Sequence, residues 1–371
     1  MFTDTDENLA LKVLIHALGL YTPSLSEKPI ADYLAGICSD LGFRDVHIDE
    51  VGNIIAVKGN GRPITMLCGH MDTVPGKILV KRDGDQIFGR GSSDAKAPLL
   101  AMLFAAACVG KNDGTIIFVG AVDEEGNATG IKNLASQKLD IDYAVFGEPS
   151  GIEKVTIAYK GRLAVTLRVN AKDSSHASAP WLSKNAIEEA AYFVKRIKES
   201  IENDSETRWN SITATLTEIS GGTSHNVTPS ECRATIDIRI PVGTSCGKIE
   251  EMVSNTVQSV SAERGVEAFH SILDETEPFE ADHSSPLVRA FNLGAAQAGI
   301  GRISLTRKTG TGDMNVIGHR FNVPVVTYGP GDPHASHTAN ESVSASEYLQ
   351  GITVLKCVLS HLKRLHDRRR N

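Results

Sequence analysis

The sequence predicts an α/β protein with a mixed, mostly parallel sheet, into which a smaller α+β domain is inserted. Between residues 64 and 149, short apolar segments alternate with helical stretches, which is typical of a parallel sheet covered by helices. From about residue 152 the order becomes strand–helix–strand, which favours an antiparallel sheet. The first pattern returns after about residue 277.

The length of 371 residues also favours two domains, because one hydrophobic core rarely serves so long a chain. We expect a larger domain made of residues 1–151 and 275–371. The inserted domain is expected to comprise residues 152–274.

The elements of the larger domain follow from its apolar runs. Short runs at 64–68, 115–122, 143–147 and 323–329 predict buried strands. Helices are expected at 95–108, which is rich in Ala and Leu, and at 344–366. Leu11, Leu14, Ile15 and Leu18 have helical spacing and predict an amphipathic first helix.

The inserted domain shows mixed polarity along its strands. Residues 154–170 predict two strands, and further strands are expected near 211–219, 231–240 and 266–273. Helices are expected at 184–202 and 246–262.

The overall composition limits the function classes. The net charge of −7 argues against a general nucleic-acid binder. No segment approaches the roughly 18 uninterrupted apolar residues that a membrane helix needs. The six cysteines are scattered without a CxxC pair, so we expect reduced thiols and a cytoplasmic location.

Three predicted strands end in side chains that can bind a metal. The run at 64–68 leads to His70 and Asp72, and the run at 115–122 leads to Asp123, Glu124 and Glu125. The strand at 143–147 leads to Glu148. The carboxyl ends of strands are where open α/β sheets place their sites.

Two further segments add candidate ligands. Asp94 stands before the predicted helix at 95–108, in GRGSSDAK, and a Gly/Pro-rich loop contains His334 and His337. Taken singly, each candidate has an ordinary explanation: a surface hydrogen bond, a solvated turn or a helix cap. Together they supply the imidazole and carboxylate groups that zinc accepts.

The segments GHMDTVP, GRGSSDAK, DEEG, FGEPS and HTANE, in this order, resemble the metallopeptidase family of acetylornithine deacetylase, succinyl-diaminopimelate desuccinylase and carboxypeptidase G. The likeness covers nearly the whole chain. It implies a zinc-peptidase-like catalytic domain and a lid or dimerisation role for the inserted domain.

The resemblance implies two divalent ions per subunit, Zn²⁺ or Co²⁺. One ion would be bound by His70, Asp94 and Glu148, and the other by Asp94, Glu125 and His337, so that Asp94 bridges them. His337 fits the family motif better than its rival His334, because Thr338 and Glu341 follow it.

Glu124 would be the general base and acid, and Asp72 would orient His70. Both roles agree with the chemistry, since a carboxylate that is not a ligand must move the proton and a ligating histidine needs an acceptor for its second N–H. One departure is visible: Ala97 and Pro98 stand where the family often has two glycines.

The inserted domain carries further candidates by the same resemblance. His176 matches an imidazole that stabilises the oxyanion and that in several members comes from the partner subunit. Asn226 and Arg239 match residues that bind a substrate carboxylate, although a cross-strand ion pair is an equal alternative for Arg239. Gly310 and Gly312, in KTGTGDMN, could present backbone N–H groups to a carboxylate.

DTVPGKI, YKGR, KTGTGDMN and YGPGDPHASHTANE look most like the LysW-lysine/LysW-ornithine hydrolases of lysine and arginine biosynthesis. That branch releases lysine or ornithine from the C-terminal glutamate of an acidic amino-group carrier protein. The resemblance also implies a homodimer. The alternatives are a small-molecule N-acyl-amino-acid deacylase, a dipeptidase, and a zinc-stabilised binding protein without catalysis. Candidates for a basic docking rim are Lys77, Lys81, Arg82, Arg302, Arg307 and Lys308.

Overall fold

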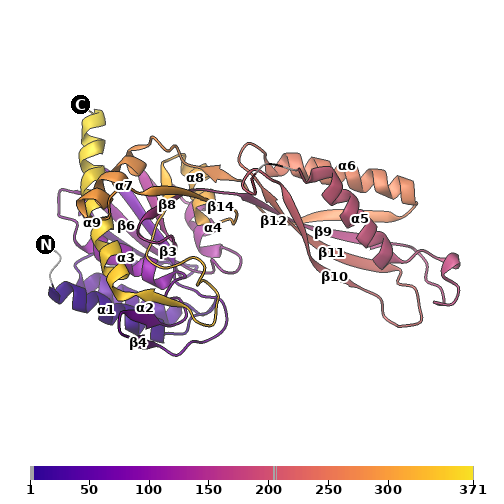
Figure 1. Ribbon diagram of the computed structural model, residues 1–371, viewed down its shortest axis with the longest axis horizontal. Helices are drawn as coiled ribbons and strands as arrows, with labels where there is room; N and C mark the ends of the chain where they lie inside the picture. Colours follow the sequence, from indigo (N-terminus) through magenta and orange to yellow (C-terminus); the bar gives the residue numbers. More distant parts are fainter. Residues whose placement is uncertain (1–3, 204, 206, 371) are drawn as a thin grey trace. The chain divides into compact units, whose positions relative to one another are not determined.

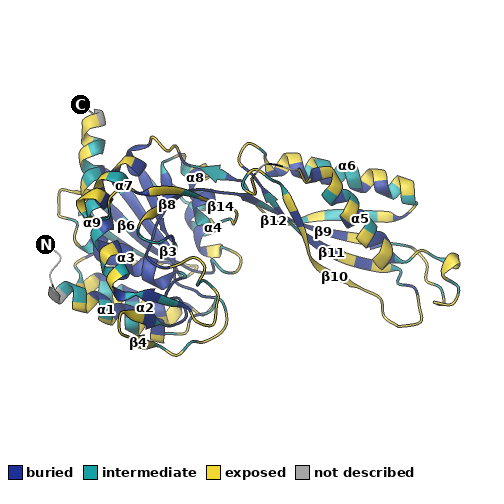
Figure 2. Ribbon diagram, in the orientation of Figure 1, coloured by how far each residue is buried: buried dark blue, intermediate teal, exposed yellow. Residues whose placement is uncertain are grey.

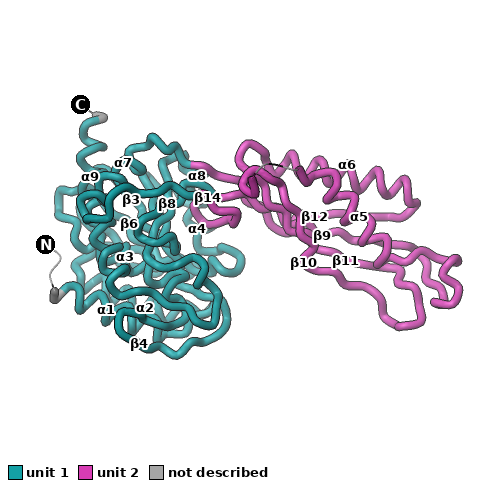
Figure 3. The backbone as a smooth tube through the Cα atoms, viewed as in Figure 1, with its two compact units in different colours: residues 1–158, 281–306, 316–371 teal, residues 159–280, 307–315 magenta. Residues whose placement is uncertain are grey.

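A computed structural model describes residues 4–203, 205 and 207–370. The chain forms two compact units, shown in different colours in Figure 3. The first comprises residues 1–158, 281–306 and 316–371, and the second comprises residues 159–280 and 307–315.

The unit boundaries differ from the predicted domain boundaries. The chain leaves the first unit after residue 158 and returns at residue 281, six to seven residues later than expected. Residues 307–315, which we expected in the larger domain, group with the second unit. The glycine-rich segment therefore belongs to the same unit as the inserted domain.

The main sheet of the first unit is mixed, as predicted, with parallel strands at its centre. Strand β3 pairs in parallel with β6 and β7, and β7 pairs in parallel with β15. The outer strands β1, β2 and β8 pair antiparallel with their neighbours. The strand bounds are β1 Arg44–Ile48, β2 Ile54–Asn60, β3 Ile64–His70, β6 Gly114–Ala121, β7 Tyr143–Gly147, β8 Lys154–Tyr159 and β15 Val325–Thr327. The sheet also includes β14 (Ser304–Lys308), which crosses the unit boundary after residue 306, and β13 (Phe279–Glu280), whose residues are counted in the second unit.

Helix α3 occupies the centre of the first unit. It packs against β3, β6 and β7 and also contacts α1 and α9, so Lys96 to Ala106 are buried on every side (Figures 1 and 2). This explains why its sequence is apolar all round rather than amphipathic. The helices that include first-unit residues are α1 Asp4–Gly19, α2 Lys28–Asp40, α3 Lys96–Ala107, α4 Thr129–Ser136, α7 Pro286–Gln297, α8 Asp313–Phe321 and α9 Ala345–Arg370.

The second unit has a four-stranded antiparallel sheet in the order β10-β11-β9-β12, which confirms the predicted α+β pattern. Helices α5 and α6 pack on one face, where Phe193, Ile197 and Val253 lie in the core. The bounds are β9 Gly161–Asn170, the short 3-10 helix η1 Pro180–Leu182, α5 Ala186–Ile201, β10 Thr213–Gly221, β11 Glu231–Ile240, α6 Cys246–Arg264 and β12 Glu267–Thr276.

A small third sheet, β16-β5-β4, was not expected from the sequence. Its strands are β4 Lys81–Asp83, β5 Gln86–Phe88 and β16 Ser342–Ser344. Strand β16 pairs antiparallel with β5, which brings the end of the His337 loop beside the segment that leads to Asp94.

None of the six cysteines, all of which are among the described residues, forms a disulfide, and four of them are buried. Among the described residues, no helix combines the length and the apolar character that crossing a membrane requires.

Candidate metal centre

The expected ligands meet at the carboxyl edge of the parallel strands. His70 is the last residue of β3, Glu125 follows the end of β6, and Glu148 follows β7 directly. Because β6, β3 and β7 are adjacent and parallel, their ends lie at one edge of the sheet (Figure 1). The parallel pairing of these strands therefore places the three side chains together.

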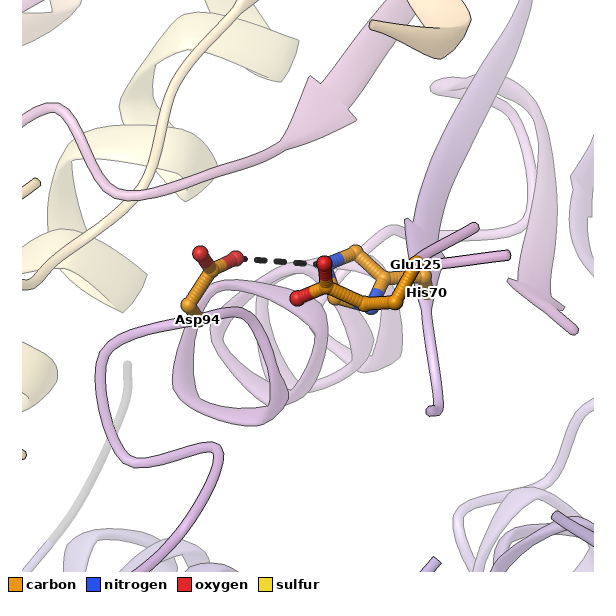
Figure 4. Close-up of side chains that lie close together, drawn as sticks. All are labelled: His70, Asp94 and Glu125. Atoms are coloured by element: carbon orange, nitrogen blue, oxygen red, sulfur yellow. Dashed lines mark hydrogen bonds and ion pairs between the residues drawn. The ribbon is translucent and has the colours of Figure 1, made fainter. Parts of the chain in front are cut away.

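His70, Asp94 and Glu125 form a cluster whose ligand atoms all lie within 4.8 Å of one another (Figure 4). His70 Nε2 is 3.3 Å from Asp94 Oδ1 and 3.6 Å from Glu148 Oε1. Asp94 arrives from the opposite side, in the turn before α3. Pro98 lies in the first turn of that helix, where a missing N–H costs no helical hydrogen bond.

His337 completes this group from the loop that precedes β16. Its Nε2 is 2.8 Å from Glu125 Oε1 and 3.3 Å from Asp94 Oδ2. Asp94 therefore faces one imidazole with each of its two oxygens, the arrangement that a bridging carboxylate needs. The ring of His334 is exposed, and none of the described contacts joins it to the cluster.

The charges in the cluster are strongly coupled. Burial alone would lower the pKa of the His70 imidazole, but the Asp72 and Asp94 carboxylates raise that pKa well above its usual value. The Asp94 and Glu125 carboxylates raise the pKa of His337 to about 9. Burial opposes the ionisation of Asp94, yet His337 and His70 hold its pKa well below the usual range. So much negative charge in one place favours a cation, and the donor set of imidazole nitrogens and carboxylate oxygens fits zinc or cobalt.

Asp72 organises two of the ligand-bearing loops. Its backbone carbonyl accepts a hydrogen bond from His70 Nδ1 (2.9 Å), which leaves Nε2 to face the cluster. Its carboxylate is fully buried and accepts the N–H groups of Glu124 (3.1 Å) and Glu125 (3.0 Å) and the hydroxyl of Ser24 (2.7 Å). Asp72 Oδ1 is 3.4 Å from His70 Nδ1, so the main chain makes the shorter contact.

A protein-family model described as peptidase family M20/M25/M40 matches residues 66–361, most of the chain and all of the cluster. This chain belongs to that family. Members of the M20 family are metal-dependent, in keeping with the cluster described here. The chain is accordingly a hydrolase.

Relatives of this M20 chain can be aligned with it over almost its whole length. The LysW-lysine/LysW-ornithine hydrolase of Sulfurisphaera tokodaii is 31% identical over 92% of this chain and 92% of its own length. The LysW-lysine hydrolase of Deinococcus radiodurans is 29% identical over 96% of this chain and 98% of its own. A Pyrococcus abyssi protein, named provisionally for the LysW-lysine/LysW-ornithine activity, is 35% identical over 95% of this chain and 94% of its own.

Solved structures show the same fold. A tripeptidase from Staphylococcus aureus superposes with a TM-score of 0.83 at 23% identity, over 96% of this chain and 99% of its own. The aminopeptidase PepT from Bacillus cereus gives a TM-score of 0.81 at 22% identity, over 96% and 98%. Both therefore agree with the two-unit fold predicted for an M20 chain.

The remaining candidates of this M20 chain lie in its second unit. His176 is exposed, and its Nδ1 is 3.1 Å from the backbone N of Ser178 and 2.7 Å from the Ser178 hydroxyl, so both contacts use the Nδ1 side of the ring. The segments of His176 and Asn226 are paired, since Ala177 N–H donates to the Asn226 carbonyl (2.8 Å).

Arg239 has partners in the second unit. Its Nε donates to Asp237 Oδ1 (2.6 Å), two residues earlier on β11, so Arg239 does form an ion pair, but within its own strand rather than across strands as expected. Its Nη1 donates to the Thr311 hydroxyl (3.2 Å), which joins Arg239 to the segment that contains Gly310 and Gly312. Among the candidates for binding a carboxylate, the structure thus brings together Arg239 and the segment of Gly310 and Gly312.

Sequence reasoning missed two residues that hold the cluster's loops. Glu27 is buried, and its Oε1 accepts the N–H of Asp123 (2.9 Å), at the start of the Glu124–Glu125 turn. No local sequence signal marks this contact. Arg90 is buried and contacts Glu341; the position of Glu341 within HTANE is the one signal that could have drawn attention to that pair.

Proposed function

We propose that this chain is a two-metal amide hydrolase that releases lysine, ornithine or both from the C-terminal glutamate of an amino-group carrier protein of the LysW type. The observation that carries the proposal is the full-length similarity to relatives named for this activity, together with the ligand cluster in the chain. The scissile bond joins the glutamate γ-carboxyl group to the α-amino group of the released amino acid.

The first unit supplies the metal ligands in this proposal. His70, Asp94 and Glu148 would hold one Zn²⁺ or Co²⁺ ion, and Asp94, Glu125 and His337 would hold the other. The contacts of Asp94 with both imidazoles support its place between the two ions. When bound, such a pair lowers the pKa of a water molecule and polarises the scissile carbonyl.

Glu124 moves the proton. It is next to the ligand Glu125, and Asp72 accepts the backbone N–H groups of both residues, which holds the turn that carries the two carboxylates. The Glu124 carboxylate is among the charges that raise the pKa of His70. Glu124 accepts the proton of the attacking water and returns it to the leaving α-amino group. Without that proton, the amine would have to leave as an anion.

His176 and Arg239 serve the substrate. The Nε2–H of His176 donates to the oxygen that becomes negative in the tetrahedral state, a contribution of roughly 3–4 kcal/mol to the barrier. The Arg239 guanidinium has five N–H donors, and its hydrogen bonds with Asp237 and Thr311 use three of them. The remainder, with the backbone at Gly310 and Gly312, bind a substrate carboxylate. Asn226 lies beside His176, at the opposite end of β11 from Arg239, so it would serve the substrate together with His176 rather than with Arg239.

A homodimer formed through the second unit is part of the proposal. Strand β10 is at the edge of its sheet, and Leu216 and Ile219 on it are 37% and 45% exposed. An exposed apolar edge strand favours pairing with another chain. The six cysteines without a disulfide support a reducing, cytoplasmic location.

The test is a turnover assay with Zn²⁺ or Co²⁺ that compares carrier-linked lysine, carrier-linked ornithine, N-acetylornithine and N-succinyl-diaminopimelate. We expect preference for the carrier-linked substrates. Preference for a small acyl substrate would retain the metal chemistry but overturn the carrier assignment. A metal-loaded enzyme that cleaves none of these amides would overturn the proposed reaction.

A further inference from the structure

Arg90 and Glu341 form a buried ion pair beside the metal centre. Arg90 Nη1 is 2.9 Å from Glu341 Oε2, and the two side chains are 9% and 1% exposed. Both residues stand next to paired strands: Phe88 of β5 is opposite Ser342 of β16, and Gly89 N–H donates to the Glu341 carbonyl (3.3 Å). The strand pairing therefore fixes the backbone of both partners.

The second carboxylate oxygen of Glu341 holds the turn that ends in Asp94. Glu341 Oε1 accepts the backbone N–H groups of Gly91 (3.0 Å), Ser93 (2.9 Å) and Asp94 (2.9 Å). Gly91 has φ +89°, and a Cβ there would lie 2.9 Å from Lys96 Cδ. The turn is therefore closely packed, and the Asp94 backbone has little freedom to move.

Arg90 ties the same turn to the loops of the two histidines. Its Nη1 also donates to the Thr338 carbonyl (3.0 Å), one residue after His337. Its Nε donates to the Gly76 carbonyl (2.9 Å), in the segment that follows His70. His70 itself ends β3 and is held by Asp72, so its position depends less on Arg90 than that of His337.

We propose that Glu341 and Arg90 are positioning residues for the metal centre. They hold the Asp94 carboxylate and the His337 imidazole close enough for one ion to be coordinated by both side chains. This inference rests on the two-metal function proposed above. The ion proposed at Asp94, Glu125 and His337 has two ligands, Asp94 and His337, that the Arg90–Glu341 pair holds in place. The ion proposed at His70, Asp94 and Glu148 has only one such ligand, Asp94. The first of these ions is therefore more sensitive to the pair.

The test is a Co²⁺ titration of the metal-free full-length protein, followed by calorimetry and by the visible absorption of bound cobalt. In Glu341→Gln the amide keeps the side-chain volume, but its NH₂ group opposes either the three backbone N–H groups or Arg90. We expect the affinity for one ion to fall by about 10–100-fold, the usual effect of losing a group that orients a ligand. The affinity for the other ion should fall by a smaller factor, and the cobalt spectrum should change.

Arg90→Lys is the second variant, and it tests the positioning role if Glu341→Gln does not fold. Lysine keeps the charge but cannot serve Glu341, Thr338 and Gly76 with the geometry of a guanidinium. The matched control is Glu189→Gln in the second unit, where a buried carboxylate pairs with Arg264 (2.7 Å). The control should lose stability but bind both ions as the wild type does.

The outcomes separate this inference from the proposed function. Two ions bound with unchanged affinity and spectrum in a folded variant of Arg90 or Glu341 would overturn the positioning role alone. An equal loss of metal affinity in Glu189→Gln would overturn it as well, because the effect would then follow general stability. A wild-type protein that binds fewer than two ions would overturn the two-metal centre and this inference with it.

Discussion

Replacing Asp72 by Asn should separate the support of the ligand loops from the ligands themselves. Asp72 Oδ2 accepts from Glu125 N–H and the Ser24 hydroxyl, and Oδ1 accepts from Glu124 N–H. In the Asp72→Asn variant the NH₂ group must oppose one of these two backbone donors, whichever way the amide turns. The Ser24 hydroxyl can rotate and accept, but a backbone N–H cannot.

The expected loss of stability follows from the number of backbone N–H groups that lose their acceptor. At least one buried N–H loses its acceptor, which costs about 1–3 kcal/mol of unfolding free energy. The Glu124–Glu125 turn also loses the charge that held both of its N–H groups. Since Glu125 is a proposed ligand and Glu124 the proposed base, metal affinity and kcat/KM should each fall by roughly 10–100-fold.

Urea unfolding of the metal-free protein, Co²⁺ titration and turnover together make the assay. The control is Asp142→Asn, because Asp142 Oδ2 accepts Ile64 N–H (2.7 Å) at the beginning of β3, whereas His70 is at its end. The control should lose stability but keep its metal affinity. Wild-type metal affinity and activity in the Asp72 variant would refute the argument that its carboxylate fixes the turn.

Three further predictions test the assigned roles. Glu124→Gln should keep the fold and both metals but lower turnover by roughly 10²–10⁴-fold, and full activity in steady-state assays would exclude Glu124 as the base. His337→Ala should lose bound metal in elemental analysis whereas His334→Ala should not, and the reverse result would exchange the two histidines. Raising the ionic strength should lower kcat/KM for the carrier substrate more than for a small N-acyl amino acid, because Lys77, Lys81 and Arg82 are exposed and available to steer an acidic carrier; equal sensitivity would argue against a basic docking rim.

The fold was largely predictable because its strands are short, apolar and regularly spaced. The runs predicted at 143–147 and 231–240 coincide with β7 and β11. Strand order also places His70, Glu125 and Glu148 at one edge by a general rule of parallel sheets. Local patterns were sufficient for these features.

What the sequence could not show depends on contacts between distant positions. Arg90 and Glu341 are 251 residues apart, and their pairing requires the small sheet of β5 and β16, whose strands are only three residues long. The grouping of residues 307–315 with the second unit follows from contacts such as that of Thr311 with Arg239. By contrast, the Asp237–Arg239 pair has the two-residue spacing of one strand face and was open to prediction.

The central claim is that five side chains of the first unit hold two ions. Anomalous X-ray diffraction from crystals grown with Zn²⁺ or Co²⁺ tests it most directly. We predict two peaks about 3.5–4 Å apart, one in contact with His70 and Glu148, the other with Glu125 and His337, and both with Asp94. A single peak, or peaks in contact with other residues, would contradict the account.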